Sequence, residues 1–449
     1  MKRRVISIIL CGLMVTGLLA GCGDSASSTT ASTTGSSGTD KTAVVADSAT
    51  SETTSAQSTT AEARTSDVSG SLTIWEHDTA FESSLEAVVE GFKAKYPNVD
   101  VEYEFKSDDY QNALTIAIQS GDAPDVFWTN GTATAYFGEF QKADALMDLT
   151  DIVDTSELPE DGLSIGTIDG KLYSVPWSCV DTRACYYNKD LFEDNGWEVP
   201  KTFDEFEELL QKEKDAGYIP ISLSPNNAWS LLFAFEPILS AYDSDYTEGL
   251  ADYSVKATDE PARGAMNKML EWAEKGYFGD NYLGVADGNA QVLTFTSGEA
   301  VMDIDGSWDT NTFLENNPDL NLGAFQIPDN NGKTGMVGTL ANGFSIYKGT
   351  KNVEAAAAFL QYCATTEAQQ AWVDGQGAVS GNKNVKSGSA VAEEIANCDT
   401  MYTSWQAVLT KHAKDGENAS TLFENDITKV FTGDMTTDEF FDEIANVMQ

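Results

Sequence analysis

The sequence is poor in positive charge. It contains 27 Lys and Arg against 71 Asp and Glu, which gives a formal net charge of −44 at pH 7. A surface of this kind repels phosphate backbones and anionic headgroups, whereas proteins that bind nucleic acids are basic. The composition therefore excludes nucleic acid as a partner.

Residues that build common metal and catalytic sites are also scarce. The two histidines, His77 and His412, are too few for an imidazole zinc site, and no GxSxG nucleophile motif is present. The DIDG segment at 303–306 resembles part of a calcium loop, but its glycine at position six would make Val301 the first ligand. We therefore expect no metal, no cofactor and no nucleophilic catalysis.

The N-terminal apolar run is too short to span a membrane. It extends from Val5 to Ala20, whereas a transmembrane helix needs ~20 residues. Basic residues precede it, and the LAGC segment at 19–22 resembles a lipobox, in which the cysteine receives diacylglycerol. We interpret residues 1–21 as a lipoprotein signal peptide and Cys22 as the lipidation site; an ordinary secretory signal with a chance cysteine is the alternative.

Cysteine usage beyond this signal does not point to a metal site. After Cys11 and Cys22, four cysteines remain, and their spacings match no zinc pattern. Exported proteins can pair such residues, so we leave open whether disulfides or buried free thiols are present. These residues are Cys179, Cys185, Cys363 and Cys398.

The segment at 22–69 reads as a lipidated cysteine followed by a flexible tether. It consists mostly of Ser, Thr, Ala and Gly, with too few large apolar residues to fold. A coil of this length has a root-mean-square span of ~35 to 40 Å. Such a tether would let a folded domain reach a membrane partner while it stays attached.

Strands and helices alternate after the tether. Short β-type runs at 72–75, 99–105 and 125–128 are separated by a helical pattern at 85–92 and another at 112–119. This alternation predicts a parallel sheet covered by helices, in an α/β chain long enough for two domains. Further helices are predicted at 202–214, where Thr202 and Glu205 form a capping box, and at 231–239 and 262–275.

Several segments of the chain are similar to one protein family. DGKLYSVP at 169–176, YYNKDLF at 186–192, PKTFDEF at 200–206 and SGDAPDVF at 120–127 resemble the extracellular solute-binding proteins of bacterial ABC importers. The resemblance is to the sugar-binding branch that includes maltodextrin-binding protein, and it covers about residues 70–380. It implies a periplasmic-binding-protein type II-like fold, in which two α/β lobes are joined by a hinge with three crossings.

The resemblance also implies how the chain divides between the lobes. The segment at 169–192 is the first crossing, the segment at 295–309 resembles a return to the first lobe, and the segment at 343–363 resembles a second return. We therefore expect residues 70–180 plus 303–340 in the N-terminal lobe. The C-terminal lobe would contain residues 181–302 plus 341–449.

Candidate ligand-binding residues follow from the rims of the predicted sheets and from the aromatic content. Ligands bind at the carboxyl ends of parallel strands, which places Glu76, His77, Asp78 and Asn130 at one rim. Indole rings stack on sugar faces, and the chain contains nine tryptophans. The resemblance matches four of these, and one acidic residue, to ligand-contacting positions: Trp128, Trp229, Trp308, Trp405 and Asp181. We interpret Trp75, Trp197, Trp272 and Trp372 as packing residues, whereas Trp177 lies in a predicted loop or segment boundary and remains a candidate without an assigned role.

The resemblance implies a function without catalysis. We expect a lipid-anchored protein on the extracellular face of the cell membrane, which binds a carbohydrate, most simply an oligosaccharide, and delivers it to an ABC transporter permease by hinge closure. We expect a monomer that touches the membrane through its anchor only. The alternatives are another polyol, a glycerophosphodiester or a peptide as ligand, a surface glycoside hydrolase that uses paired carboxylates, or an adhesin or sensor subunit.

Overall fold

The structure is a computed structural model, in which residues 67–106 and 110–449 are described. The described residues belong to one compact unit. The predicted signal peptide, Cys22 and nearly all of the predicted tether lie outside the described residues.

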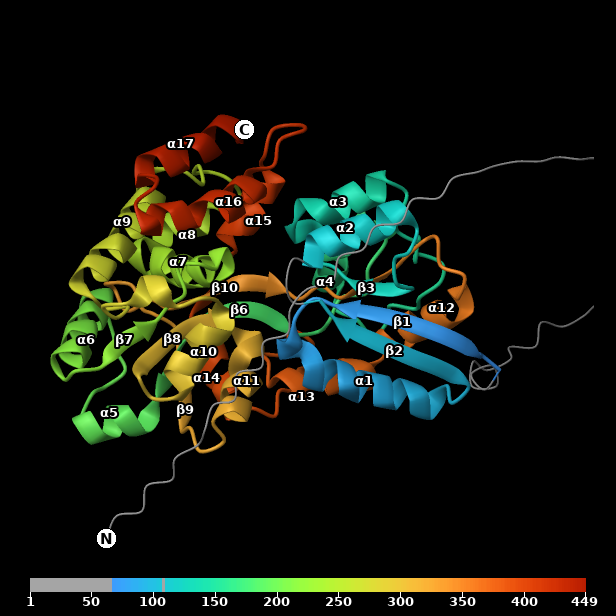
Figure 1. The fold of residues 1–449 in the computed structure, drawn as a ribbon, viewed down its shortest axis with the longest axis horizontal. Helices are drawn as coiled ribbons and strands as arrows, with labels where there is room; N and C mark the ends of the chain where they lie inside the picture. The colour runs from blue at the N-terminus through green and yellow to red at the C-terminus, as the bar shows by residue number, and fades with distance from the viewer. Residues whose placement is uncertain (1–66, 107–109) are drawn as a thin grey trace, which may run out of the picture. The chain divides into compact units, whose positions relative to one another are not determined.

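The first β-sheet combines the early strands with one strand from much later in the chain. Its strands are β1 (Gly70–Glu76), β2 (Val99–Phe105), β3 (Val126–Trp128) and β11 (Phe344–Ile346). Their order across the sheet is β11–β3–β1–β2 (Figure 1). β1 is parallel to β2 and β3, whereas β11 is antiparallel to β3. The three predicted early strands are thus confirmed.

Helices cover this first sheet. Leu85, Val88, Val89 and Phe92 form the buried stripe of the predicted first helix. Figure 1 shows this helix, α1, along one side of the sheet and α2 and α3 on the other. The helices around the sheet are α1 (Glu82–Lys95), α2 (Tyr110–Ser120), α3 (Ala135–Lys142), α4 (Glu160–Ile165), α12 (Val353–Cys363) and α13 (Thr366–Gln376), with the short turns η2 (Thr79–Phe81) and η3 (Gly131–Ala133) and the small hairpin β4 (Thr167–Ile168) and β5 (Lys171–Leu172).

The second β-sheet is built around one long strand. Its strands are β6 (Val180–Asn188), β7 (Ile219–Ser222), β8 (Ala300–Gly306), β9 (Leu322–Phe325), β10 (Gly335–Leu340) and β12 (Thr400–Thr403). Their order is β12–β10–β6–β8–β7, and β9 also pairs with β6. β6 is antiparallel to β10 near its start and to β8 and β9 further along.

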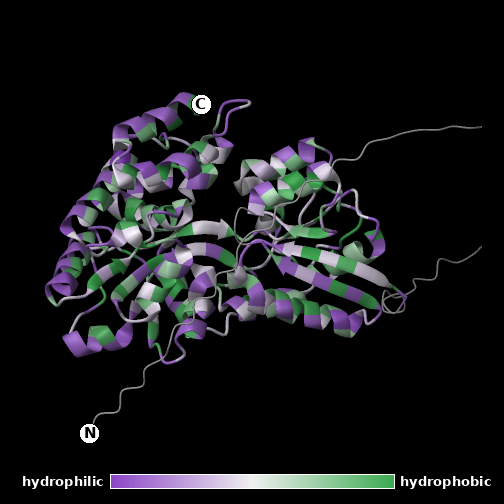
Figure 2. Ribbon diagram, in the orientation of Figure 1, coloured by the Kyte–Doolittle hydropathy of each residue, from purple (hydrophilic) through white to green (hydrophobic). Residues whose placement is uncertain are grey.

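The helices of the second part include the three predicted ones: α6 lies within one residue of its predicted bounds, and α7 and α9 are longer than predicted. Thr202 accepts a hydrogen bond from the Glu205 backbone N–H, and this cap starts α6. Figure 2 shows apolar residues on the strands and many polar residues on the helices. These helices are α5 (Lys189–Asn195), α6 (Phe203–Asp215), α7 (Ala228–Tyr242), α8 (Ser244–Gly249), α9 (Glu260–Lys275), α10 (Gly288–Thr296), α11 (Thr310–Asn316), α14 (Ala390–Ala396), α15 (Trp405–Lys411), α16 (Ala419–Thr432) and α17 (Thr437–Val447), with the short turns η4 (Tyr282–Gly284) and η5 (Ser307–Asp309).

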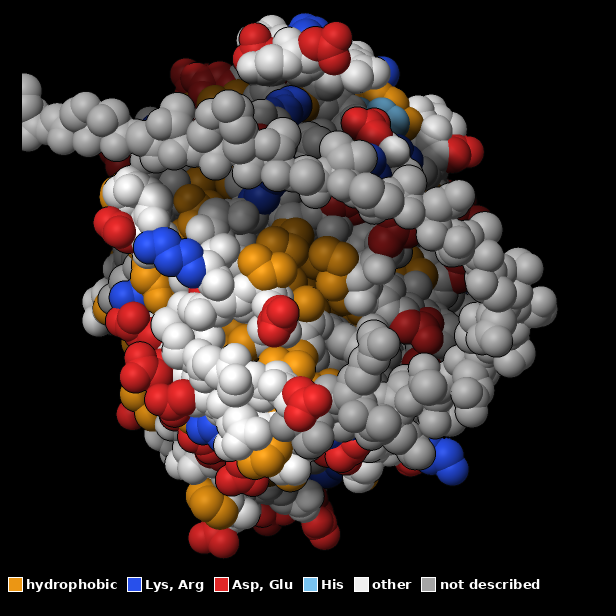
Figure 3. All heavy atoms as spheres, turned by 90° about the vertical axis from the view of Figure 1, so that its right-hand side faces the viewer, with side chains coloured by type: hydrophobic (Ala, Val, Ile, Leu, Met, Phe, Trp, Pro, Cys, Tyr) orange, Lys and Arg blue, Asp and Glu red, His pale blue; other side chains and the backbone are white. Residues whose placement is uncertain are grey.

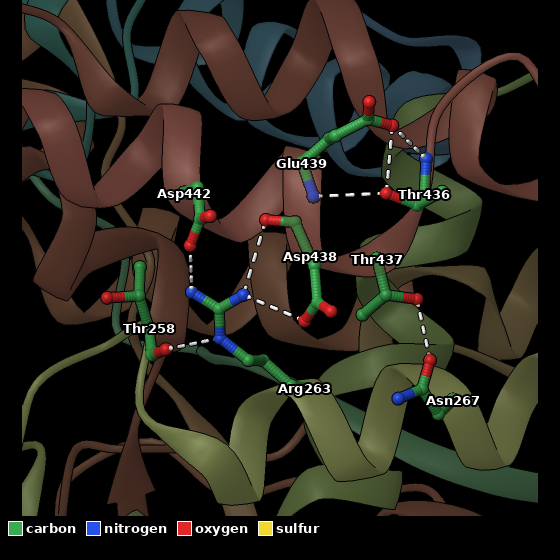
Figure 4. A network of polar contacts seen from close by, with 8 residues as sticks. All are labelled: Thr258, Arg263, Asn267, Thr436, Thr437, Asp438, Glu439 and Asp442. Carbon is green, nitrogen blue, oxygen red and sulfur yellow. Dashed lines mark hydrogen bonds and ion pairs between the residues drawn. The ribbon is translucent and has the colours of Figure 1, made fainter.

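Helices α9 and α17 are held together by a polar network (Figure 4). The Arg263 guanidinium pairs with the carboxylates of Asp438 and Asp442 at 3.1 Å and 2.7 Å, and its Nε donates to the Thr258 carbonyl. The Thr437 hydroxyl donates to Asn267 at 2.7 Å. This network fixes the C-terminal helix on the second part of the molecule.

The hydrophobic cores define two α/β lobes. One core gathers buried side chains from residues 72–179 and 341–385 around the first sheet. The second lobe has two clusters of buried side chains, which come from residues 180–340 and 379–448. The expected fold class, two α/β lobes, is confirmed.

Within the described residues, the chain passes between the lobes at three places, and these lie side by side. Backbone hydrogen bonds join Ala341 N–H to the Cys179 carbonyl at 2.9 Å and Val180 N–H to the Val379 carbonyl at 2.8 Å. Gly381 N–H donates to the Ser178 carbonyl at 2.7 Å. The crossings therefore form one hydrogen-bonded strip beside the start of β6.

The division of the chain between the lobes differs from the expected one. Residues 303–340 were expected in the first lobe, but β8 is a central strand of the second sheet, paired with both β6 and β7. The segment at 344–376 was expected in the second lobe, but Phe344 and Ile346 are fully buried beside β3 in the first. The return to the first lobe therefore comes at Leu340–Ala341, not at 295–309.

None of the helices in the described part of the chain has both the length and the apolar character needed to cross a membrane.

Candidate functional site

The first predicted rim lies at the carboxyl ends of β1 and β3. Glu76 ends β1 and is fully buried, and its Oε1 accepts a hydrogen bond from the His77 N–H at 2.8 Å. Burial raises the pKa of the Glu76 carboxyl, while the hydrogen bonds with His77 act in the opposite direction. Asp78 caps the short turn η2 by accepting from the Ala80 N–H at 3.0 Å. These three residues therefore form a tight polar turn after the strand.

Trp128 belongs to this rim but is covered. Its side chain is 5% exposed, and the His77 ring stacks on the indole with 3.4 Å between the ring centroids. The Tyr110 hydroxyl donates to the Trp128 carbonyl at 2.7 Å. One indole face is thus occupied by His77, so a sugar could stack there only after His77 moves. Asn130, two residues on, is partly exposed at the start of η3.

The second lobe brings together two of the predicted tryptophans. Trp229 and Phe233 lie one turn apart on α7, with ring centroids 6.1 Å apart. The Phe233 ring meets the Trp308 ring edge-on at 5.0 Å. Both tryptophans are partly exposed. We call Trp229, Phe233 and Trp308 the aromatic cluster.

Local sequence explains why these rings meet. Asn227 caps the start of α7 and accepts hydrogen bonds from the Trp229 and Ser230 N–H groups at 2.9 Å and 3.4 Å, which fixes the first turn of the helix. Gly306 makes room for the Trp308 ring, because a Cβ at this position would lie 2.1 Å from an atom of that ring. A side chain at position 306 would therefore displace the indole.

Asp181 and Arg183 stand beside the aromatic cluster on the same face of β6. The guanidinium carbon of Arg183 lies 4.6 Å from the Phe233 ring centroid and 5.3 Å from that of Trp308. Burial raises the pKa of the Asp181 carboxyl to about 7, although the charges of Arg183 and His77 act to lower it. His77 belongs to the first rim, so Asp181 lies where groups of both lobes meet.

The end of β8 adds more carboxylates. Asp305 accepts hydrogen bonds from the Gly306 N–H at 2.7 Å and from the Gln291 side chain at 3.4 Å. Burial raises the pKa of Asp305 to about 7, and the charge of Asp78 adds to this shift while Arg183 opposes it. Desolvation, Asp305 and Asp78 also raise the pKa of Asp309. Asp78 in the polar turn of the first lobe is therefore close enough to Asp305 and Asp309, near the aromatic cluster, for their charges to interact.

Trp405 lies elsewhere, and the expectation that it contacts ligand is not supported by its position. Its side chain is 1% exposed, and its indole N–H donates to the Ala257 carbonyl at 2.8 Å. Its ring packs against Phe235, Phe423 and Phe441 in the core of the second lobe. With its polar group satisfied and its faces covered, Trp405 is a packing residue.

The other tryptophans divide as follows. Trp272 and Trp372 are buried, as predicted for packing residues, and Trp177 stacks on Trp372 with 4.1 Å between centroids. Trp197 is partly buried. Trp75 was expected in the core, but it is partly exposed at the edge of the first core, where the Lys106 ammonium lies 4.6 Å over its ring.

The described part of the chain offers little metal or redox chemistry. Across residues 67–106 and 110–449, no group of three or more His, Cys, Asp or Glu side chains is arranged to hold a metal ion. The four cysteines left open by sequence are free thiols, of which Cys179, Cys185 and Cys363 are buried and Cys398 is partly exposed.

Sequence reasoning missed three residues of this site: Arg183, Phe233 and Asp305. Arg183 is two residues after Asp181, so strand alternation already puts both side chains on one face. Phe233 is four residues after Trp229, which on a helix puts both rings on one face. A search for neighbours at these two spacings would have found Arg183 and Phe233.

Comparisons with known proteins agree with this architecture. The family model described as bacterial extracellular solute-binding protein matches residues 78–370. The multiple sugar-binding protein of Streptococcus mutans is 27% identical over 315 residues, which are 68% of this chain and 73% of that protein. The diacetylchitobiose binding protein DasA of Streptomyces coelicolor is 27% identical over 347 residues, 73% of this chain and 77% of that protein.

Solved structures show the same fold. A chitin oligosaccharide binding protein superimposes with a TM-score of 0.70 at 23% identity, covering 84% of this chain and 98% of that one. RafE in complex with raffinose gives a TM-score of 0.68 at 22% identity, also covering 84% and 98%.

Proposed function

Because the chain belongs to the family of bacterial extracellular solute-binding proteins, we propose that it binds a carbohydrate, most simply an oligosaccharide, and delivers it to an ABC transporter permease. The family is one of binding proteins, so no bond of the ligand is made or broken. Relatives named for maltotriose, diacetylchitobiose and several sugars support a carbohydrate as the ligand.

The observation that carries the proposal is the aromatic cluster beside buried carboxylates. Trp229 and Trp308 are partly exposed and meet through Phe233, and the Arg183 guanidinium beside Phe233 and Trp308 acts on the carboxyl groups of Asp181 and Asp305. Aromatic rings stack on the apolar faces of pyranose rings, and carboxylates accept strong hydrogen bonds from hydroxyl groups. Together these groups suit a polar ligand with flat apolar faces, as a sugar has.

Both lobes would contact the ligand when they close on it. The polar turn at Glu76, His77 and Asp78 and the nearby Asn130 belong to the first lobe. In the aromatic cluster, Trp229 and Phe233 pack on the core of the second lobe, whereas Trp308, which follows β8 of the second sheet, packs against the core of the first. A ligand that touches both favours the closed form, which is a shift in population. The hydrogen-bonded strip of crossings supplies a defined place for the bending.

The N-terminal sequence supports attachment to the membrane. The LAGC segment that ends at Cys22 would make the protein a lipid-anchored lipoprotein on the extracellular face, and a pneumococcal relative is named a lipoprotein. We propose that the anchored protein is a monomer that meets the permease subunits. Replacement of Cys22 by Ala would then release it from membranes without changing its affinity for sugar.

A thermal-shift panel tests the proposed ligand class. The panel contains maltotriose, raffinose, diacetylchitobiose and xylotriose, with glycerol phosphodiesters and a tripeptide as competing classes. A sugar at 100 times its dissociation constant adds ~2.7 kcal/mol to the free energy of unfolding. A shift with one of the sugars supports the proposal, whereas a shift with a diester or the peptide alone, or no shift at all, contradicts it.

A further inference from the structure

We propose that Arg183 is a positioning residue of this site, one that fixes Phe233 and Trp308 and balances the charge of Asp181 and Asp305, so that the site takes uncharged and not anionic sugars. The inference rests on the proposed function and names the charge class of its ligand. Arg183 lies near the middle of β6, and its side chain contacts Glu236 and Phe233 on α7 and Trp308 in η5.

The guanidinium of Arg183 is enclosed. Its residue is 6% exposed, its Nε lies 3.2 Å from Oε2 of Glu236 on α7, and aromatic rings lie against it within 4.6 Å and 5.3 Å. Its Nε atom is fully buried and makes no hydrogen bond, so this edge of the planar cation does not meet a ligand. It acts instead on the groups around it, which the ligand does meet.

Glu236 is itself held in place, and this makes the arginine rigid. Its Oε1 accepts hydrogen bonds from the Ser404 hydroxyl at 2.6 Å and from the Gln406 N–H at 3.3 Å, at the start of α15. Glu236 is 1% exposed, so the pair is desolvated. A cation anchored in this way can hold an aromatic face in one orientation, because cation–π attraction grows when water is excluded.

The charges around the arginine are mostly negative. Asp181 interacts electrostatically with Arg183, which is on the same strand, and with His77, which is in the first lobe. Asp305 faces Asp303 on its own strand, Arg183 on β6, Asp78 in the first lobe and Asp309 in η5. The one cation that acts on both Asp181 and Asp305 is thus Arg183, and it is already paired with Glu236.

This balance disfavours an anionic ligand. A sugar carboxylate or phosphate would enter beside several carboxylates, with the arginine already compensated, and like charges that meet at a binding site oppose association. The formal net charge of −44 adds to this repulsion. Figure 3 shows acidic side chains distributed over one face of the molecule, with fewer basic ones.

Arg183 also influences the pH at which the carboxyl groups of Asp181 and Asp305 become ionised. Burial raises the pKa of Asp181 and of Asp305 to about 7, and Arg183 opposes both shifts. Sugar hydroxyls donate to the ionised carboxylates, so affinity is present above the carboxyl pKa and is lost as the pH falls through it. Without the cation, the pKa rises further, and the loss of affinity moves to higher pH.

The experiment compares Arg183→Met/Glu236→Gln, Arg183→Lys and wild type. The double variant removes both charges of the buried pair, so that no lone charge opposes folding. Arg263→Met is the matched control, because Arg263 is also ion-paired and lies over an aromatic ring, that of Phe441, but in the α9–α17 network (Figure 4). Each protein is titrated by calorimetry between pH 5.5 and 8.5 with the sugars of the panel and with trigalacturonic acid.

We expect wild type to bind a neutral panel sugar and to bind trigalacturonic acid at least about tenfold more weakly, a difference of 1.4 kcal/mol. In the double variant, the midpoint of the affinity loss should move up by about one pH unit. Arg183→Lys should keep the wild-type midpoint but bind more weakly, because an ammonium does not stack as a guanidinium does. Arg263→Met should match wild type in its sugar affinity and in the midpoint pH of the affinity loss.

The outcomes separate the two proposals. If wild type binds none of the sugars, the proposed function fails and this inference fails with it. If wild type binds a neutral sugar but binds trigalacturonic acid equally well, the charge class is wrong. If wild type binds a neutral sugar and the folded double variant keeps its affinity and pH midpoint, Arg183 is a structural residue only.

Discussion

Two tryptophan-containing regions of the second lobe illustrate how the same residue type serves packing in one place and recognition in another. Trp405 is enclosed by three phenylalanines and its N–H is satisfied by the Ala257 carbonyl. Trp308 is partly exposed, meets Phe233 and Arg183, and stands beside Asp305 on the neighbouring strand end. The first region is a closed core, whereas the second leaves part of its aromatic surface exposed next to buried polar groups.

This contrast shows that the neighbours of an indole define its role better than its position in the chain. Both tryptophans lie two residues after the last residue of a strand of the second sheet. The side chains against Trp405 are apolar, whereas those against Trp308 include a cation. The two sites should therefore respond to truncation in different ways.

The largest expected effect is on stability. Trp405→Ala should lower the free energy of unfolding by about 3 to 5 kcal/mol, because it leaves a large cavity in a core that cannot fully collapse. Urea unfolding followed by circular dichroism measures this. A loss below about 1 kcal/mol would contradict the assignment of Trp405 to the core.

The next effect is on binding. Trp308→Ala should weaken the binding of the panel sugar by ~2 kcal/mol or more, as expected for an aromatic contact at the centre of a site. Calorimetry measures the affinity, and urea unfolding should show a much smaller change than for Trp405→Ala. Wild-type affinity in this variant would remove Trp308 from the site.

A smaller change tests the placement of the same ring. Gly306→Ala adds a Cβ that would lie 2.1 Å from the Trp308 ring, so the indole must move. We expect the affinity to fall by about 1 kcal/mol, at the lower end of what forced repacking costs. Gly138→Ala is the control, because a Cβ at Gly138 in α3 has nothing within 4 Å, and it should bind like wild type.

The smallest effect concerns pH. The pKa of Asp181 is raised to about 7 in the folded protein, above its unfolded value. The stability contributed by protonated Asp181 is fully present below the unfolded pKa and is lost as the pH rises through about 7. Without sugar, Asp181→Asn should therefore lose less stability than wild type between pH 6 and 8. Identical stability profiles in melting experiments would show that Asp181 is solvated.

Sequence reasoning predicted the local structure of the first lobe well. The apolar run around Leu72 and Ile74 and the stripe from Leu85 to Phe92 are set by burial on one face of a strand or helix, which alternation and periodicity report directly. The polar residues after β1 could also be placed, because parallel strands end at one edge of a sheet.

Sequence reasoning failed where the answer depends on partners distant in the chain. The placement of β8 and β11 is decided by which strand each one pairs with, and a buried apolar strand fits either sheet. The prediction that Trp405 contacts the ligand failed for the same reason, because the three phenylalanines that enclose its ring come from three different helices. In the sequence, Arg183 is one of many charged residues. Its proposed role follows only from its contacts with Phe233 and Trp308 in the folded chain.

The most direct test of the central claim is to observe the tryptophans while sugar binds. Protein labelled with 5-fluorotryptophan, with resonances assigned by Trp→Phe variants, is titrated with the panel sugar and followed by fluorine NMR. We predict that the resonances of Trp229 and Trp308 shift with saturation, while those of Trp405 and Trp272 stay in place. Saturating sugar that leaves Trp229 and Trp308 unmoved would contradict a carbohydrate site at the aromatic cluster.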